Sequence, residues 1–390
     1  MKLSPRNWVV VLLAVAVVAG GIAIYYHLQD QNKPQQTVRD ETPKQVEKLP
    51  VVSKLPPVVL VHGYNQSDEF WKSIDIIHQL KTNDYCHMGN FEYDADGKLA
   101  IHEPVKITEG QSAVYTLGLP DMGTVDIKKS AALLNEGIAS VVKRHRCESV
   151  RLVGFSLGGV VCREYITMVE NPPVSQFISI SSPHLGSEFA RVALLYQKMT
   201  NAKLAVDGEE ATSFGDKAKS KLKKASLFSG IESLKKLSES IKIPIDSKAA
   251  RMLAPPFDDN YLAQLNKRPH PETIDYHSIV TEENILTYQW QEAMEDWEKL
   301  KDFDFKSASI SIAALDLLRH TVGKMDKLKK AVGTKTFRGD GVVSCLSQDM
   351  NQIEAFKNSE KLKATVHKVE SSHMAARVQK ELMTLLTEEK

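Results

Sequence analysis

Residues 149–168, SVRLVGFSLGGVVCREYITM, decide the predicted fold. The run 149–153 has the apolar character of a strand, and 160–168 has the pattern of a helix. A Gly-x-Ser-x-Gly turn centred on Ser156 joins them. A chain that passes from strand to helix through so sharp a turn needs neighbours without a Cβ, and it lifts the serine hydroxyl clear of the sheet. We therefore predict a strained turn that presents Ser156.

The same alternation of strand and helix extends in both directions from this turn. The run VVLV is continuously apolar, as in a strand buried on both faces of a parallel sheet. We predict strands at 58–61, 149–153, 176–180, 273–280 and 364–369, and helices at 127–146, 160–168 and 374–386, with Asp126 as an N-cap. This order predicts an α/β fold with a mostly parallel sheet and helices on both faces.

Two helical insertions interrupt the alternation, at about 187–271 and 286–332. They are candidates for a lid or cap, and surface helices packed on the edge of the core are the alternative. Within the first, the Lys-rich amphipathic segment 217–242 could lie on an anionic bilayer or form a solvated helix face.

The N-terminal region differs from the rest of the chain. Residues 8–26, WVVVLLAVAVVAGGIAIYY, carry no charge and follow Lys2 and Arg6, which predicts a signal anchor with one transmembrane helix over 1–28. A signal peptide cleaved after 17–19 is the alternative. A polar tether over 29–54 and an α/β domain over 55–390, which carries the two insertions, follow. Both readings place that domain outside the cytoplasm, in the periplasm or at the cell surface, because the basic residues lie on the N-terminal flank.

Charge and cysteine usage exclude several classes of protein. Lys and Arg number 50 against 49 Asp and Glu, so no overall field favours nucleic acid, and we expect no nucleic-acid partner. The four cysteines lack CxxC or metal-ligand spacing, so neither a zinc site nor a thioredoxin-type site is expected.

A serine hydroxyl is a poor nucleophile near neutral pH, so Ser156 needs a base and an orienting carboxylate. His373 fits the base because it follows the strand 364–369 at the carboxyl edge of the sheet. Asp340, between two glycines, is the candidate acid on a tight exposed turn. The N–H groups of Tyr64 and Leu157 are the expected donors to an oxyanion.

These motifs resemble those of the α/β-hydrolase superfamily, in the lipase-like branch that includes GPI inositol-deacylase-like esterases. Five segments carry the resemblance, namely VVLVHGY, VRLVGFSLGGVVCREY, ISISSPHLGS, AARMLAPPFDDNYLAQLN, and RGDGVVS followed by SSHMAA. It implies Ser156 as nucleophile, Asp340 as acid and His373 as base, with the Tyr64 and Leu157 N–H groups as the oxyanion hole.

The resemblance also implies how substrate is bound. It places His62 and Phe155 among the substrate-binding residues, although relatives usually carry His where this chain has Phe155. The insertion before Asp340 is longer than the resemblance leads us to expect. No metal or organic cofactor is implied.

The sequence thus predicts a serine hydrolase that cleaves carboxylic esters of lipids or other hydrophobic acyl groups through an acyl-enzyme. Its expected partners are the ester or lipid substrate and the membrane. An acyltransferase or a phospholipase on the same three residues, and a catalytically silent binding module of the cell envelope, are the alternatives.

Overall fold

The computed structural model of the chain describes residues 55–387 apart from 94–98, 103–105, 109, 188–189, 191–196, 198–246, 256–259, 283–338, 341 and 374–375. The predicted anchor 1–28, the tether 29–54, the Lys-rich segment 217–242 and the insertion 286–332 lie outside these residues. Within them, no helix is long and apolar enough to cross a membrane.

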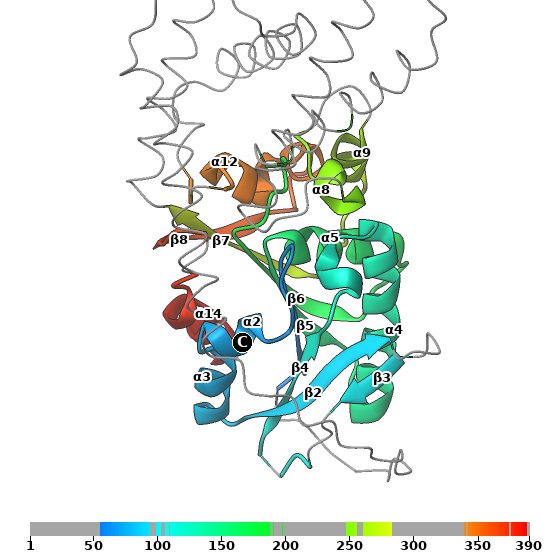
Figure 1. The fold of residues 1–390 in the computed structure, drawn as a ribbon, viewed down its shortest axis with the longest axis vertical. Coiled ribbons are helices and arrows are strands. Elements are labelled where there is room, and N and C mark those ends of the chain that lie inside the picture. Colours follow the sequence, from blue (N-terminus) through cyan, green and yellow to red (C-terminus); the bar gives the residue numbers. More distant parts are fainter. Residues whose placement is uncertain are drawn as a thin grey trace, which may run out of the picture.

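An eight-stranded sheet in the order β3-β2-β4-β1-β5-β6-β7-β8 forms the centre of the domain (Figure 1). The strands are β1 Val58–Val61, β2 Tyr85–Tyr93, β3 Leu99–His102, β4 Ser112–Leu117, β5 Val150–Phe155, β6 Val174–Ile180, β7 Asp275–Glu282 and β8 Ala364–Glu370. Only the pairing of β2 with β3 is antiparallel. The mostly parallel sheet expected from the sequence is confirmed.

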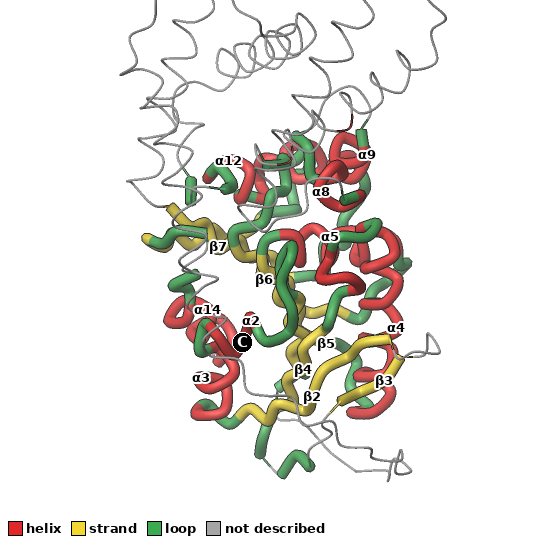
Figure 2. The backbone as a smooth tube through the Cα atoms, viewed as in Figure 1, coloured by secondary structure: helices red, strands yellow, loops and turns green. Residues whose placement is uncertain are grey.

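Helices cover both faces of the sheet, with α4 and α5 on one side and α3 and α14 on the other (Figure 2). The helices are α2 Phe70–Ser73, α3 Ile76–Thr82, α4 Ile127–His145, α5 Leu157–Met168, α8 Lys248–Met252, α9 Tyr261–Lys267, α12 Cys345–Gln348, α13 Glu354–Lys357 and α14 Gln379–Thr387, with 3-10 turns at Pro120–Gly123 and Met350–Gln352. The predicted helix 374–386 thus begins five residues later than expected, at Gln379.

The pattern of β1 explains this layering. Val59 and Val61 pack into the apolar cluster under α4 and α5, whereas Val58 and Leu60 pack into the cluster under α2, α3 and α14. All four are at most 1% exposed, so each face of the strand is removed from water. A strand such as β1, which is buried on both faces, therefore requires a continuous apolar run.

Strands β2, β3 and β4 were not predicted from the sequence. The register of β2 shifts between His87 and Gly89, which breaks the alternation of side chains along the strand. Polar residues also lie inside this part of the sheet, where Thr116 Oγ1 donates to Asn90 Oδ1. Their hydrogen bonds are made across strands, so the local sequence gives no sign of them.

Helix α4 matches its prediction closely and offers a test of the packing. Asp126 caps it by accepting a hydrogen bond from Lys128 N, as expected. Gly137 lies in its interior, and a Cβ there would meet its nearest neighbour, Phe91 Cγ, at 3.7 Å, an ordinary contact. Gly137→Ala should therefore raise the free energy of unfolding by about 0.5–1 kcal/mol, because alanine loses less backbone entropy in a helix. Chemical denaturation measures this, and a loss of stability would contradict the packing of α4 on β2.

Candidate active site

The Ser156 turn joins β5 to α5 at the carboxyl edge of the sheet. Ser156 has φ 50° and ψ −121°, and its N–H donates to Ile180 O at 2.8 Å. A non-glycine residue at this positive φ is strained, and surrounding structure must hold it there. Helix α5 begins directly afterwards at Leu157, so the helix begins three residues earlier than the predicted 160.

Three glycines allow α5 to approach the strand ends this closely. A Cβ on Gly158 would lie 2.3 Å from Val61 O, and one on Gly154 would lie 2.5 Å from Gly159 Cα. Contacts this short with backbone cannot be relieved by a side-chain rotation. The packing around Ser156 therefore requires glycine at these positions of the motif.

The structure brings Ser156, His373 and Asp340 together from three distant parts of the chain. His373 Nε2 lies 2.9 Å from Ser156 Oγ, and His373 Nδ1 lies 2.8 Å from Asp340 Oδ2. The three side chains are buried, and His373 N also donates to Asp340 O at 2.9 Å. The carboxylate thus orients the imidazole so that its other nitrogen faces the hydroxyl.

Asp340 differs from its predicted setting. The turn was expected to be exposed, but Asp340 is 1% exposed, so this expectation is corrected. Its Oδ1 accepts hydrogen bonds from Val342 N at 3.1 Å and Val343 N at 2.8 Å. Its Oδ2 accepts from Thr281 Oγ1 at 2.8 Å and Gln348 Nε2 at 3.2 Å. Sequence reasoning missed Thr281 and Gln348, since neither lies in a recognisable motif.

The loop after β1 lies against the nucleophile, as the oxyanion-hole prediction requires. Val61 pairs with Gly154, and a Cβ on Gly63 would lie 3.1 Å from Ser156 Cβ. Tyr64 follows in this loop, with its hydroxyl 2.6 Å from Ser247 Oγ just before α8. Leu157 is the first residue of α5, where a backbone N–H has no acceptor within the helix.

His62 and Phe155, the predicted substrate-binding residues, are both buried next to the site. His62 is fully buried and accepts from Leu119 N through Nε2 at 2.9 Å, so its Nδ1 carries the proton and donates to Gly63 O at 2.9 Å. Phe155 is 1% exposed and packs between Phe70 and the His373 ring. Both residues therefore support the loop and the imidazole, and their contact with substrate stays a prediction.

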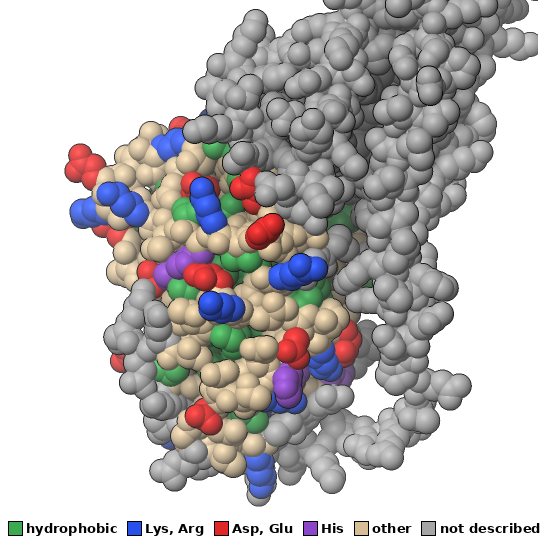
Figure 3. Space-filling view, turned by 90° about the vertical axis from the view of Figure 1, so that its left-hand side faces the viewer, with side chains coloured by type: hydrophobic (Ala, Val, Ile, Leu, Met, Phe, Trp, Pro, Cys, Tyr) green, Lys and Arg blue, Asp and Glu red, His purple; other side chains and the backbone are tan. Residues whose placement is uncertain are grey.

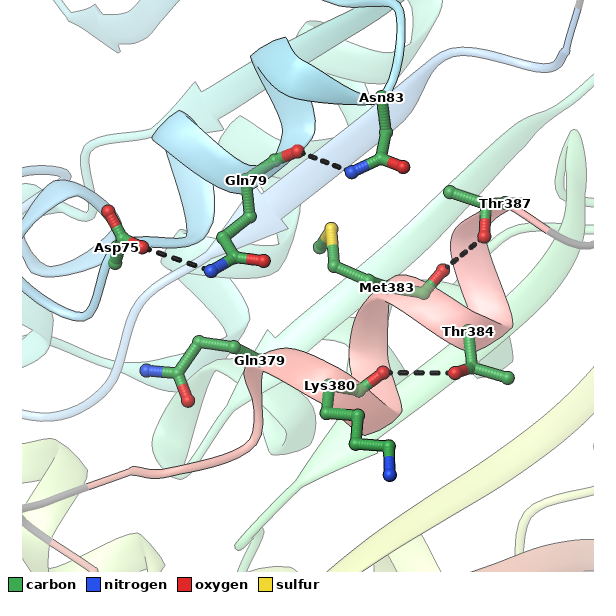
Figure 4. Close-up of a pocket in the computed structure, with 8 residues that line it drawn as sticks. All are labelled: Asp75, Gln79, Asn83, Gln379, Lys380, Met383, Thr384 and Thr387. Atoms are coloured by element: carbon green, nitrogen blue, oxygen red, sulfur yellow. Dashed lines mark hydrogen bonds between the residues drawn. The ribbon is translucent and has the colours of Figure 1, made fainter.

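The described surface also carries a groove and a mixture of charged side chains. A groove of about 680 Å³ lies between α3 and α14, and none of its lining residues is a predicted site residue (Figure 4). No group of three or more His, Cys, Asp or Glu side chains in the described part is placed to hold a metal ion. Figure 3 shows cationic and anionic side chains interspersed over the described part of one face.

Comparisons with known proteins agree with this architecture. Residues 57–236 match the sequence model of the palmitoyl protein thioesterase family. The chain is similar to triacylglycerol lipase 2 of Saccharomyces cerevisiae, with 25% identity over 185 residues, which is 42% of this chain and 55% of that lipase. The chain thus spans about half the length of this curated relative.

Solved structures of lipases are also similar. The mature form of Bacillus licheniformis lipase BlEst2 is 15% identical, with 88% of this chain and 96% of that chain covered and a TM-score of 0.40. Lipase 1 from Pelosinus fermentans is 13% identical, with 86% and 99% covered and a TM-score of 0.45.

The parallel sheet, the strained serine between β5 and α5, and the chain order Ser156, Asp340, His373 define an α/β-hydrolase architecture. The match to the thioesterase family model and the similarity to a triacylglycerol lipase agree with this architecture.

The close approach of α5 to β1 is testable with one methyl group. Gly158→Ala should lower the free energy of unfolding by about 2–4 kcal/mol, because the new Cβ meets the carbonyl oxygens of Val61 and His62. Gly137→Ala is the matched control, since it adds the same methyl at ordinary van der Waals distances from its neighbours. Equal stability of the two variants in chemical denaturation would contradict the packing of the turn.

Burial lowers the pKa of His62 from 6.5 to about 4. The unfolded chain therefore binds a proton that the folded protein does not, so stability falls as pH drops from about 6.5 towards 4. Over this pH range, protonation linked to His62 lowers the free energy of unfolding by roughly 3 kcal/mol. His62→Gln removes the titrating group and keeps an acceptor for Leu119 N, so it should flatten part of this slope. Identical slopes in denaturation series over this pH range would contradict the neutral, buried imidazole.

Proposed function

We propose that the protein is a serine hydrolase that cleaves carboxylic esters of lipids or other hydrophobic acyl groups. The observation that supports this best is the continuous hydrogen-bonded line from Ser156 Oγ through His373 to Asp340, at 2.9 Å and 2.8 Å. These are the distances over which an imidazole accepts a hydroxyl proton while a carboxylate holds its tautomer.

Acylation begins when His373 Nε2 takes the proton of Ser156 as the hydroxyl oxygen attacks the acyl carbonyl. Asp340 stays ionised and stabilises the imidazolium that forms. The Tyr64 and Leu157 N–H groups donate to the oxyanion of the tetrahedral intermediate. His373 then gives its proton to the departing alcohol, which leaves an acyl group on Ser156.

Deacylation repeats these steps with water. His373 removes a proton from a water molecule as the water oxygen attacks the acyl-enzyme. His373 then gives this proton to Ser156 Oγ when the carboxylic acid leaves. An acceptor alcohol in place of water would make the same site an acyltransferase. A lipid with a phosphorylated headgroup as the ester would make it a phospholipase.

The comparisons support a hydrophobic acyl group and name two kinds of ester. The yeast relative is a triacylglycerol lipase, and the matching family model is that of palmitoyl protein thioesterases. The attack of Ser156 is the same on an oxoester and on a thioester, so acyl thioesters are the second candidate substrate. Residues 1–28, as the proposed signal anchor, would hold the domain outside the cytoplasm beside membrane lipids.

Ester turnover by the full chain in detergent micelles tests the proposal. Long-chain and short-chain p-nitrophenyl esters and a palmitoyl thioester are the substrates, and we expect kcat/KM to rise with acyl length. Ser156→Ala and His373→Ala should each reduce kcat by roughly 10³-fold or more, because nucleophile and base act as one unit.

Ser182→Ala is the matched control for these variants. Ser182 is a buried serine beside the turn whose hydroxyl lies near the Gly154 and Ile180 carbonyl oxygens. The Ser182→Ala variant should keep most of the activity. Turnover that survives in Ser156→Ala would contradict the proposed nucleophile, and a well-folded chain without turnover of any ester would favour the silent binding module.

A further inference from the structure

Among the residues that the structure describes, two side chains other than His373 donate to the Asp340 carboxylate. Thr281 lies near the carboxyl end of β7, and its hydroxyl is 2.8 Å from Asp340 Oδ2. Gln348 is the last residue of α12, and its Nε2 is 3.2 Å from the same oxygen. Both are buried. Neither takes part in the proton transfers proposed above.

The orientation of the Gln348 amide is fixed by its neighbours. Thr281 N lies 2.7 Å from Gln348 Oε1, and a backbone N–H can only donate. The oxygen of the amide must therefore face β7, so the NH₂ group faces the carboxylate. Nε2 also lies 3.0 Å from Thr281 O and from Val343 O, acceptors that a reversed amide could not satisfy.

The neighbours of the Thr281 hydroxyl also determine which acceptor its proton faces. Its oxygen lies 2.6 Å from Ser181 Oγ, 2.8 Å from Asp340 Oδ2 and 3.2 Å from Gln348 Oε1. The hydroxyl has one proton, and the carboxylate is the nearer of the two acceptors and carries charge, so Thr281 donates to Asp340 and accepts from Ser181. With the Val342 and Val343 N–H groups on Oδ1, two side chains and two backbone groups hold the carboxylate in addition to His373.

Helix α12 is itself anchored to the segment after β6. Ser347 Oγ donates to Gly186 O at 2.6 Å and accepts from Leu185 N at 3.0 Å. Ser347 O also accepts from His184 N at 2.9 Å. Ser347 therefore anchors this short helix, whereas the adjacent Gln348 contacts the Asp340 carboxylate.

We propose that Gln348 and Thr281 are positioning residues that orient the Asp340 carboxylate and limit its negative charge towards His373. This inference rests on the proposed function of the three residues. Each donor draws charge from Oδ2, and a carboxylate with fewer donors holds a proton on the neighbouring imidazole up to a higher pH. Loss of either donor therefore moves the acidic limb of the kcat/KM profile to higher pH.

The other titratable groups around this carboxylate come from three elements. His373 follows β8, and Cys345 of α12 interacts with Asp340, with Glu282 of β7 and with Lys368 of β8. Burial, together with Glu282 and Asp340, raises the pKa of the Cys345 thiol to about 12. The thiol is thus neutral across the working range, so it does not produce the acidic limb.

Thr281→Val and Gln348→Glu in the full chain test the inference with p-nitrophenyl butyrate over a series of pH values. Thr281→Val removes one donor at nearly constant volume. Gln348→Glu keeps the acceptor for Thr281 N and replaces the NH₂ donor by a second carboxyl group. We expect kcat to fall about tenfold with little change in KM, and the acidic limb to move up by roughly 0.5–1 pH unit in each variant.

Two further variants separate positioning from general damage. Thr281→Ser keeps the hydroxyl and should restore the profile of the unmodified chain. Ser347→Ala removes an anchoring hydroxyl from the same helix and should lower the melting temperature without moving the limb. An unmoved limb in both Thr281→Val and Gln348→Glu would overturn the inference while the proposed function stands. Turnover that does not depend on Ser156 in the unmodified chain would overturn both.

Discussion

The site depends on one steric constraint, the approach of helix α5 to the ends of β1 and β6 around Ser156. The left-handed φ of 50° at Ser156 is held because Gly158 packs against the backbone of β1 and Ser156 N bonds to Ile180 at the end of β6. Strain of this kind persists only where the surrounding structure fixes it, and here the surroundings are the two strands on either side of β5. The sheet therefore determines where the hydroxyl points.

The sheet also collects the other groups of the site. In a parallel sheet all carboxyl ends lie at one edge, so the loops after β1, β6, β7 and β8 meet there although they are far apart in the chain. β8 delivers His373 and β7 delivers Thr281, while the turn at Asp340 packs onto both through hydrogen bonds. Burial of these polar groups is tolerated because nearly all their hydrogen bonds are made within the protein.

Sequence reasoning succeeded where a local motif marks the residue, as at Ser156, and it failed where a contact between distant residues leaves no local pattern. Three features are local patterns: the apolar run of β1, the N-cap of α4 and the glycines around Ser156. Each pattern reflects the packing of the residues that form it. Strands β2 to β4 were missed because a bulge and a buried polar pair, Asn90 with Thr116, disturb their alternation. The roles of Thr281 and Gln348 depend on a carboxylate from another part of the chain, and the buried hydrogen-bond partner of His62, Leu119 N, is likewise 57 residues away.

Intact-mass analysis of the full chain after reaction with a fluorophosphonate tests the central claim most directly, because this reagent forms a covalent adduct only with an activated serine. We expect one adduct, located at Ser156 by peptide mapping. An adduct on another serine, or none on folded protein, would contradict the claim that Ser156, His373 and Asp340 form a working catalytic unit.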